Sequence, residues 1–404
     1  MDTFENQIKP FNKLLEERKE KIDSGSTKPL VKTFPVNELA ERLHPEKQFL
    51  KVFKIVEHGP DARSFYFKPD TDNGTNHLAY FRSGQYISLR LKIDDSYVTR
   101  PYAICSSPAD AMNDIYMLTI KLVQTGFVTP YIWDNWKVGT KIEASAPAGT
   151  LYYQPLRDKK HIIGIAGGSG ITPFYSMAKS ISEGVEDVDL TILYGSRTHD
   201  NILLGEELNK LTKETDKVKV VNVLSDENIS GYEHGFISAA LISKYQPAQD
   251  YSIFICGPNV MYKFANKEIA TLHLPAGRVR HELNGDFGTP YNELDYPTSA
   301  KNKIFNLTVR VRDDERVIKA KSNESLLVAM ERAGIKAPSM CRSGECGFCR
   351  SQLINGKAFT PTSIDGRRIA DKKFGYVHTC DAYPLSDLTI DVPVHDLESV
   401  TTRE

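Results

Sequence analysis

The stretch that decides the fold is CRSGECGFC, residues 341–349, together with a further cysteine at position 380. Four residues separate Cys341 from Cys346, and two separate Cys346 from Cys349. This spacing, followed by a distant fourth cysteine, is one in which four thiolates hold a [2Fe–2S] cluster. We therefore assign Cys341, Cys346, Cys349 and Cys380 as iron ligands.

The other residues of this loop suit the same assignment. Gly344 and Gly347 let the backbone fold tightly and turn its N–H groups toward sulfur, and we expect Ser343 and Arg342 to add donors. A zinc site would favour two separated C-x2-C pairs or a mixture of Cys and His ligands. Here His378 is a single histidine and a poor substitute ligand. Disulfides are disfavoured in a chain without a secretory signal. An iron–sulfur cluster is the reading that remains.

Composition excludes several classes of protein. The chain has 404 residues, of which 25% are charged and 40% hydrophobic, as in an ordinary soluble protein of several domains. A net charge of −1 gives no basic field for nucleic acid. We find no apolar run long enough for a transmembrane helix and no signal peptide, and therefore expect no membrane span and a reducing cytoplasm.

Residues 1–46 are expected to form a helical extension. Apolar residues recur at helical spacing up to Leu15. Pro10 interrupts this pattern, so we expect a break rather than a single straight helix. Asn37 is a candidate N-cap for a second helix that ends at Leu43. These helices are expected to pack on the body or to mediate self-association, and partner docking is the alternative.

Residues 47–157 are expected to form an antiparallel β-barrel. Closely spaced alternating segments, separated by Gly, Pro and Asp, are typical of such barrels. We predict strands at 49–56, 64–67, 86–91 and 116–123.

Residues 158–296 alternate between predicted strands and helices. The continuous apolar run at 161–166 is typical of a strand buried on both faces. Helical segments such as 203–211 and 260–271 lie between further strands. This alternation predicts a parallel, doubly wound sheet.

Residues 303–404 form the third predicted domain, after a linker at 294–303. A hairpin turning at Asp313-Asp314 and a helix over 325–332 precede the cluster loop, and a closing strand over 388–392 follows it.

Arg100, Tyr102 and Ala103 are candidate flavin-binding residues in the barrel. Arg100 and Tyr102 are two residues apart on a predicted strand, so their side chains lie on the same face. Both can therefore contact one flavin: Arg100 as the cation for its phosphate and Tyr102 as the aromatic side chain against its ring. Glycine can bring main-chain N–H groups to a pyrophosphate. The candidates for this contact with the pyrophosphate of the flavin cofactor lie later in the sequence: Lys121, Val123, Gly126, Val128 and Thr129.

A glycine cluster after the 161–166 strand is the candidate nucleotide loop. Gly168 and Gly170 let a pyrophosphate approach a helix end, and Thr172 is expected to cap that helix. Since ligands of open α/β sheets bind at the carboxyl ends of strands, the tripeptide Cys256-Gly257-Pro258 is expected in the same crevice.

The order of these features resembles the ferredoxin–NADP reductase superfamily. With the appended cluster loop, the chain is similar to the single-chain flavin/[2Fe–2S] reductases, which include the oxygenase reductases for phthalate and phenylacetyl-CoA and the hybrid-cluster-protein reductase. The resemblance covers about residues 47–400. It implies a multidomain fold: an antiparallel β-barrel that binds flavin, an α/β doubly wound nucleotide domain and a C-terminal β-grasp domain of the plant-type ferredoxin kind.

The resemblance also implies roles for particular residues. Cys256 lies beside the nicotinamide and shapes that contact rather than acting as a nucleophile, and Glu282 matches an acid near the flavin ring. Ala103 departs from the family, which has Ser or Thr there, so a hydroxyl to the flavin is missing. The loop at 126–130 favours FAD, with FMN as the alternative. Arg197 suits a 2′-phosphate but also occurs in NADH-using relatives, so NADH and NADPH both stay open.

The expected function is an NAD(P)H-dependent flavoprotein oxidoreductase. Electrons pass from NAD(P)H through flavin and a [2Fe–2S] cluster, one at a time, to a separate acceptor protein such as an oxygenase. The alternatives are a reductase for an anaerobic or hybrid-cluster acceptor, reverse flow from reduced ferredoxin-like donors to NAD(P)+, and a redox-responsive regulatory module. Four acidic residues are candidates to guide a basic acceptor, with an ordinary solvated surface as the equal alternative: Asp365, Asp371, Asp381 and Asp387.

Overall fold

The structure, a computed structural model, describes residues 4–28, 34–275, 277–282 and 288–394. The chain divides into two units, Met1–Glu41 and Arg42–Glu404. In the described residues, no helix is both long and apolar enough to cross a membrane.

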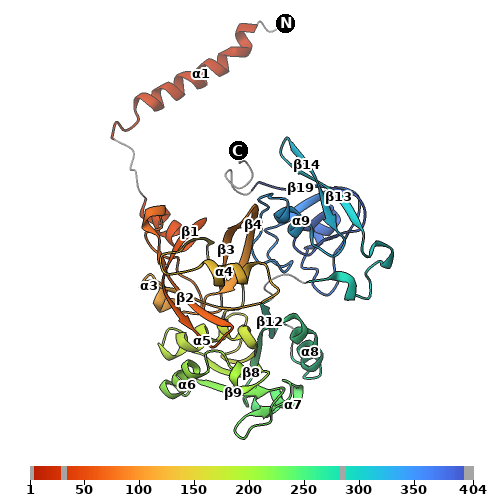
Figure 1. The fold of residues 1–404 in the computed structure, drawn as a ribbon. Coiled ribbons are helices and arrows are strands. Elements are labelled where there is room, and N and C mark those ends of the chain that lie inside the picture. Colours follow the sequence, from red (N-terminus) through yellow and green to blue (C-terminus); the bar gives the residue numbers. More distant parts are fainter. Residues whose placement is uncertain (1–3, 29–33, 276, 283–287, 395–404) are drawn as a thin grey trace. The chain divides into compact units, whose positions relative to one another are not determined.

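The first helix of the first unit, α1 (Phe4–Asp23), runs through Pro10 (Figure 1). The predicted break at Pro10 is therefore wrong. Proline removes only one main-chain hydrogen bond, and the residues after it are mostly strong helix formers. Helix α2 (Pro35–Leu43) starts two residues before the predicted cap at Asn37, because proline suits the first helical position.

Six antiparallel strands form the first sheet of the second unit. Their spatial order is β4-β3-β6-β1-β2-β5, so β4 and β5 are the two edges of an open barrel. Apolar side chains such as Leu50, Phe65 and Leu89 fill its interior. The elements are β1 (Lys47–Glu57), β2 (Ala62–Pro69), β3 (Tyr86–Ile93), β4 (Ser96–Ala103), α3 (Pro108–Met112), β5 (Tyr116–Lys121), α4 (Val128–Asn135) and β6 (Lys141–Ser145).

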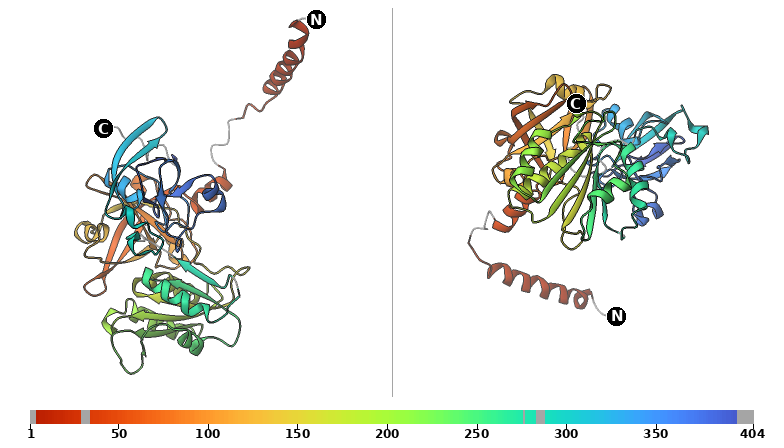
Figure 2. Two further views of the ribbon diagram at one scale, coloured as in Figure 1. Left: turned by 90° about the vertical axis from the view of Figure 1, so that its right-hand side faces the viewer. Right: turned by 90° about the horizontal axis from the view of Figure 1, so that it is seen from below.

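The second sheet is parallel, with the order β10-β9-β8-β7-β11-β12. Helices cover both of its faces, as Figures 1 and 2 show: α5 and α6 pack on one face and α7 and α8 on the other. The elements are β7 (His161–Gly167), α5 (Thr172–Ser182), β8 (Asp189–Ser196), α6 (Gly205–Glu214), β9 (Val218–Leu224), β10 (Glu233–His234), α7 (Ala239–Tyr245), β11 (Tyr251–Cys256), α8 (Asn259–Ala270) and β12 (Val279–Glu282).

This arrangement sets where a ligand binds. The chain steps outward from β7 to β10 and then returns to the other side of β7 with β11. The strand order therefore reverses between β7 and β11, and a crevice opens beyond their carboxyl ends. The barrel and this sheet share one core, in which Cys105, Met117 and Leu151 pack with residues of α5 and β8.

The third region is a five-stranded mixed sheet, β14-β13-β19-β15-β17, with α9 packed on it. Its hairpin turns at Arg312-Asp313, one residue before the predicted position, because Val311 pairs with Asp314 and Arg312 takes a positive φ of 53°. The elements are β13 (Ile304–Val311), β14 (Asp314–Lys321), α9 (Leu326–Arg332), β15 (Arg350–Asn355), β16 (Ala358–Phe359), α10 (Ile369–Lys373), β17 (Tyr376–His378), β18 (Tyr383–Pro384) and β19 (Leu388–Asp391).

The predicted linker at 294–303 is not a loose spacer. Tyr296 and Ala300 are buried, and they pack against Phe359 and Tyr383 of the third region. An aromatic pair, Tyr296 and Phe359, lies with ring centroids 5.1 Å apart. The segment is thus anchored to the domain that carries the cluster loop.

Candidate functional site

The four cysteines predicted as iron ligands come together in two pairs. The Sγ atoms of Cys349 and Cys380 lie 3.3 Å apart, and the side chains of Cys341 and Cys346 share a hydrogen bond. Of the four, only Cys346 is exposed.

Main-chain N–H groups are directed at the sulfur atoms. Gly344 N lies 3.2 Å from Cys380 Sγ, and Cys346 N lies 3.4 Å from Cys341 Sγ. Gly344 takes a φ of 80°, and a Cβ atom there would lie 2.2 Å from Asp381 Oδ2. Because N–H donors stabilise thiolate charge, the loop suits a cluster of negative charge.

The pairing tests which metal group fits. In the described part of the chain, no three His, Cys, Asp or Glu side chains converge as the ligands of one metal ion. A [2Fe–2S] cluster needs two thiolates at each iron, since its two sulfides complete each tetrahedron. Two separate pairs therefore fit a binuclear cluster and not a zinc ion.

Arg342 is placed differently from our expectation. Its side chain is fully buried, and Nη1 lies 2.5 Å from Oε1 of Glu331, on α9. The residue thus ties the cluster loop to α9 as half of a buried ion pair. Ser343 keeps a main-chain donor at Cys341 Sγ, at 3.5 Å.

The prediction of an acidic acceptor-guiding surface is wrong for three of its four residues. Asp371 and Asp381 are only 4% and 1% exposed. Asp365 lies 2.8 Å from the Arg367 guanidinium, and Asp387 accepts a hydrogen bond from a main-chain N–H. Asp365, Asp371 and Asp381 are thus buried or paired, and Asp387 alone of the four is exposed.

The predicted flavin residues of β4 lie at an edge of the barrel. Arg100 and Tyr102 are half-buried and pair with Leu89 and Ile87 of β3. Burial raises the pKa of Tyr102 to about 12, so its hydroxyl stays protonated and can donate. Ala103 ends the strand opposite Tyr86.

The second predicted group lies where the other edge strand, β5, leads into α4. The Thr129 hydroxyl accepts from Val123 N at 2.9 Å and donates to Val123 O at 3.3 Å, which closes the loop around Gly126. Val128 is buried in the first turn of α4, and Lys121 pairs with Asp61 at 3.1 Å.

The two barrel groups together suit a flavin. Strands β4 and β5 are the edges of the sheet and contact each other, so their ends meet across the open seam of the barrel. Val123 and Phe127 are 54% and 52% exposed beside the Gly126 loop. Exposed apolar side chains next to a helix start give a flat ligand with a phosphate both stacking area and N–H donors.

The predicted nucleotide loop lies at the point where the strand order reverses. Gly168 and Gly170 belong to a short 3-10 turn, Gly168–Ile171, between β7 and α5. Thr172 does not cap α5: it lies inside the first turn, and its hydroxyl donates to Ser169 O at 3.0 Å. Helix α5 therefore starts without a side-chain cap, and N–H groups stay available for a pyrophosphate.

This loop packs closely against the tripeptide that ends β11. A Cβ atom on Gly170 would lie 2.1 Å from the carbonyl oxygen of Cys256, and one on Gly257 would lie 3.2 Å from the main-chain nitrogen of Gly167. Only glycine allows this approach. Pro258 lines the same contact, since a Cβ atom on Gly167 would lie 3.0 Å from Pro258 Cδ.

Cys256 and Glu282 end adjacent parallel strands and pair in register. Cys256 is 8% exposed. Burial raises the pKa of its thiol, and the negative charge of Glu282 raises it further. The thiol is therefore neutral, which suits a shaping role rather than a nucleophile.

Tyr86 is a site residue that the sequence reading missed. It is 2% exposed, and a Cβ atom on Gly149 would lie 2.9 Å from its ring and 3.3 Å from Glu282 Oε1. Burial raises the pKa of Tyr86, and so do the nearby Cys341 and Cys346. Tyr86 therefore lies where the barrel, the nucleotide crevice and the cluster loop meet. The one sequence feature that could have drawn attention to Tyr86 is the Gly84-Gln85 turn directly before it.

Arg197 lies at the carboxyl end of β8, away from this meeting point. Its Nε atom lies 2.9 Å from Oδ2 of Asp226, which follows β9. The neighbouring Glu227 accepts a hydrogen bond from His199 N at 2.7 Å. Two carboxylates thus hold the loop that the sequence suggested for a 2′-phosphate.

Three domain families match the chain in succession. They are the oxidoreductase FAD-binding domain at residues 50–153, the oxidoreductase NAD-binding domain at 165–267 and the 2Fe-2S iron-sulfur cluster binding domain at 309–385. These matches confirm the predicted three-domain fold class and favour FAD over FMN.

Relatives match the chain over most of its length. It is 30% identical over 345 residues to the ferredoxin reductase component of 3-ketosteroid-9-alpha-monooxygenase from Rhodococcus rhodochrous, covering 84% of this chain and 94% of that protein. It is 29% identical over 329 residues to one of the subunits of 1,2-phenylacetyl-CoA epoxidase from Escherichia coli strain K12, covering 77% and 88%. Phthalate dioxygenase reductase has the same fold, with a TM-score of 0.61 at 22% identity, covering 89% of this chain and 100% of that one.

Proposed function

Because this chain belongs to the single-chain flavin/[2Fe–2S] reductases of the ferredoxin–NADP reductase superfamily, we propose that it delivers electrons from NADH to a separate oxygenase component. One observation carries the oxygenase assignment: the relatives matched over most of the chain are named as reductase components or subunits of oxygen-inserting enzymes. The electron acceptor is a protein, and the reductase itself supplies no oxygen chemistry.

The cofactors supply the chemistry: bound flavin accepts hydride from the nicotinamide, and the bound cluster passes single electrons. The contribution of the chain is placement. Gly170 and Gly257 bring the two crevice loops together, and Cys256 and Glu282 form the end of the crevice toward the barrel. On the side of the barrel, the crevice is bounded by the buried Tyr86 and by Gly149 packed against its ring. The protein accelerates the reaction by holding the reactive groups in one geometry and by excluding water.

We propose NADH rather than NADPH as the donor. The Arg197 guanidinium is paired with Asp226, and Glu227 lies beside it on the same loop. A carboxylate near the ribose accepts a hydrogen bond from a 2′-hydroxyl, whereas it repels a 2′-phosphate. The sequence suggested Arg197 as a phosphate ligand, and its pairing with Asp226 supports the opposite preference.

An anaerobic titration tests the reductase activity. We expect full reduction to need about 1.5 equivalents of NADH, because hydride carries two electrons and the cluster adds one electron to the two that flavin holds. The variant Cys349→Ser should lose the cluster and need about one equivalent. An NADH requirement that is the same for both proteins would contradict the assignment of the cysteines.

The oxygenase assignment needs its own test. The reductase is mixed with purified oxygenase components from the same organism, and NADH-dependent product formation is measured. Product should form only when both proteins are present and should be lost with Cys349→Ser. If cytochrome c is reduced but no oxygenase component accepts electrons, the chain is a reductase with a different acceptor.

A further inference from the structure

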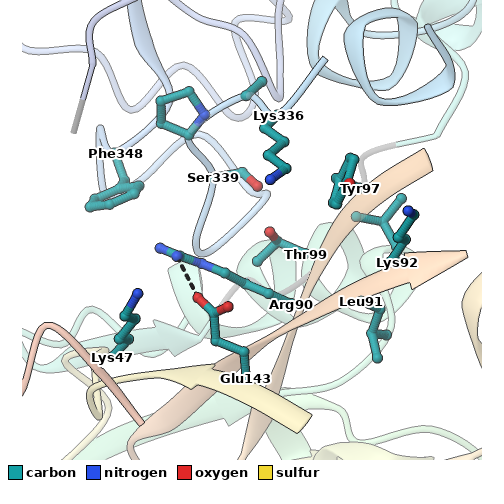
Figure 3. Close-up of a pocket in the computed structure, with 13 residues that line it drawn as sticks. Lys47, Arg90, Leu91, Lys92, Tyr97, Thr99, Glu143, Lys336, Ser339 and Phe348 are labelled. Atoms are coloured by element: carbon teal, nitrogen blue, oxygen red, sulfur yellow. Dashed lines mark hydrogen bonds and ion pairs between the residues drawn. The ribbon is translucent and has the colours of Figure 1, made fainter. Parts of the chain in front are cut away.

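A cavity of about 270 Å³ lies between the barrel and the cluster domain. Figure 3 shows Arg90, Thr99 and Glu143 of the barrel strands on one side and Lys336 and Ser339 on the other. None of these residues belongs to the flavin, nucleotide or cluster sites described above.

The lining of the cavity is strongly cationic. Among the residues that the structure describes, Lys47, Arg90, Lys92 and Lys336 line it with one carboxylate, Glu143, so this described lining has three more cations than carboxylates. Arg90 Nη1 lies 2.7 Å from Glu143 Oε1, which neutralises one of the four cations.

The Tyr97 ring lies between two of the other ammonium groups of the lining (Figure 3). Lys336 Nζ lies 4.5 Å, and Lys92 Nζ 5.5 Å, from the centroid of the same Tyr97 ring. Like charges gathered in a partly enclosed space repel each other, and a bound anion relieves that repulsion.

A buried hydroxyl gives a second, independent indication. Ser339 is 5% exposed, and its Oγ atom has no hydrogen-bond partner among the residues that the structure describes. A buried polar group of this kind is costly unless a ligand or solvent pairs with it. On the facing strand, Thr99 adds a second hydroxyl to the lining at 7% exposure.

The position of Ser339 links the cavity to the cluster loop. It lies two residues before Cys341, and Ser88 Oγ of the barrel donates to the intervening Met340 carbonyl at 3.0 Å. A ligand that bonds Ser339 and Lys336 on one side and the barrel cations on the other therefore joins the two domains next to the first iron ligand.

We propose that this cavity binds a phosphate group, free or as a monoester of a small metabolite, and that its occupation fixes the Cys341 loop on the barrel. Phosphate has the charge to offset the excess cations and enough acceptor oxygens for ammonium and hydroxyl donors at once. The binding does not depend on the proposed oxygenase partner.

The test is calorimetric titration of the holoprotein, saturated with NAD+, with inorganic phosphate and with glycerol phosphate at constant ionic strength. NAD+ fills the nucleotide crevice, so any remaining heat reports another site. We expect binding that the variant Lys336→Gln weakens at least about tenfold, because a charge-assisted contact is lost. Ser339→Ala should weaken it several-fold while leaving the charge unchanged.

Lys357→Gln is the matched control, since it removes an exposed lysine of the same domain outside the cavity. It should bind phosphate like the unmodified protein. Tighter binding of glycerol phosphate than of phosphate identifies a metabolite as the source, and the reverse identifies the free ion. Affinity unchanged by both Lys336→Gln and Ser339→Ala, or no heat beyond that of chloride, would overturn the proposal.

Hydrogen exchange supplies a second readout. Phosphate should slow amide exchange in residues 336–342 of the unmodified protein and leave it unchanged in Lys336→Gln. Protection in both proteins would show that phosphate acts elsewhere.

Discussion

The nucleotide crevice and the cluster loop are both tight turns that must hold a cofactor, yet they are stabilised in different ways. In the crevice, the 3-10 turn and the end of β11 approach so closely that Gly170 has no room for a side chain. In the cluster loop, Arg342 and Glu331 are buried as an ion pair, at 1% and 4% exposure. Both loops need a glycine at a crowded position, Gly170 and Gly344, but only the cluster loop is also held by a buried ion pair.

The difference indicates what each region tolerates. A region shaped by close backbone contact should be disrupted by an added side chain but little affected by the loss of a nearby charge. A region held by a buried ion pair should in addition be sensitive to the loss of a charge, because removal of one partner takes away its compensation of the other buried charge.

The largest effect is expected at the buried pair. Glu331→Ala should lower the free energy of unfolding of the cluster domain by about 3–5 kcal/mol, since it removes the carboxylate that pairs with the buried Arg342 guanidinium. Glu315→Ala is the matched control: it breaks the exposed pair with Arg310 of the same domain and should cost about 0–1 kcal/mol. The measurement is urea unfolding followed by the visible absorbance of the cluster. Equal costs for the two variants would show that burial of the pair is energetically unimportant.

The next effect tests the crevice. Gly170→Ala places a methyl group 2.1 Å from the Cys256 carbonyl oxygen, so the two loops must separate. A displacement near 1 Å can cost about 100-fold in rate, and we expect a loss of that size in NADH-driven flavin reduction in stopped flow. Reduction of the cluster by dithionite should be unchanged.

Gly168→Ala is the control for the same turn. Gly168 has a φ of 52° but open space around its Cα atom, so alanine there costs only the left-handed backbone strain of about 1–2 kcal/mol. Hydride transfer should fall far less than in Gly170→Ala. A similar loss in both variants would mean that backbone strain, rather than loop contact, limits this site.

The sequence predicted features that local patterns encode. Cysteine spacing predicted the four thiol ligands, because ligation requires a fixed short loop between Cys341 and Cys349, and the structure adds their arrangement in two pairs. The change from short alternating strands to a strand–helix rhythm indicated the open barrel and the parallel sheet. The glycines of the crevice were noted for a pyrophosphate, whereas the structure adds a packing reason for Gly170 and Gly257.

Other features depend on contacts that spacing does not report. Whether an aspartate faces solvent or a partner depends on tertiary packing, so the acidic surface was predicted wrongly from residues such as Asp371 and Asp381. Tyr86 became a site residue only when Gly149 and Glu282 came from distant positions to meet it. The cationic cavity likewise joins Arg90 with Lys336, from two domains.

The smallest effect extends the comparison to a third loop, where charge sets specificity rather than stability. Asp226→Asn removes the carboxylate that pairs with Arg197, so the guanidinium becomes available to a 2′-phosphate. We expect kcat/KM for NADPH to rise about tenfold, equivalent to about 1.4 kcal/mol, while kcat/KM for NADH changes by less than about threefold. Ser225→Ala, which removes a hydroxyl bonded to the same carboxylate, should shift the ratio much less. If the unmodified protein already prefers NADPH, Arg197 binds the phosphate despite Asp226, and local charge does not decide the donor.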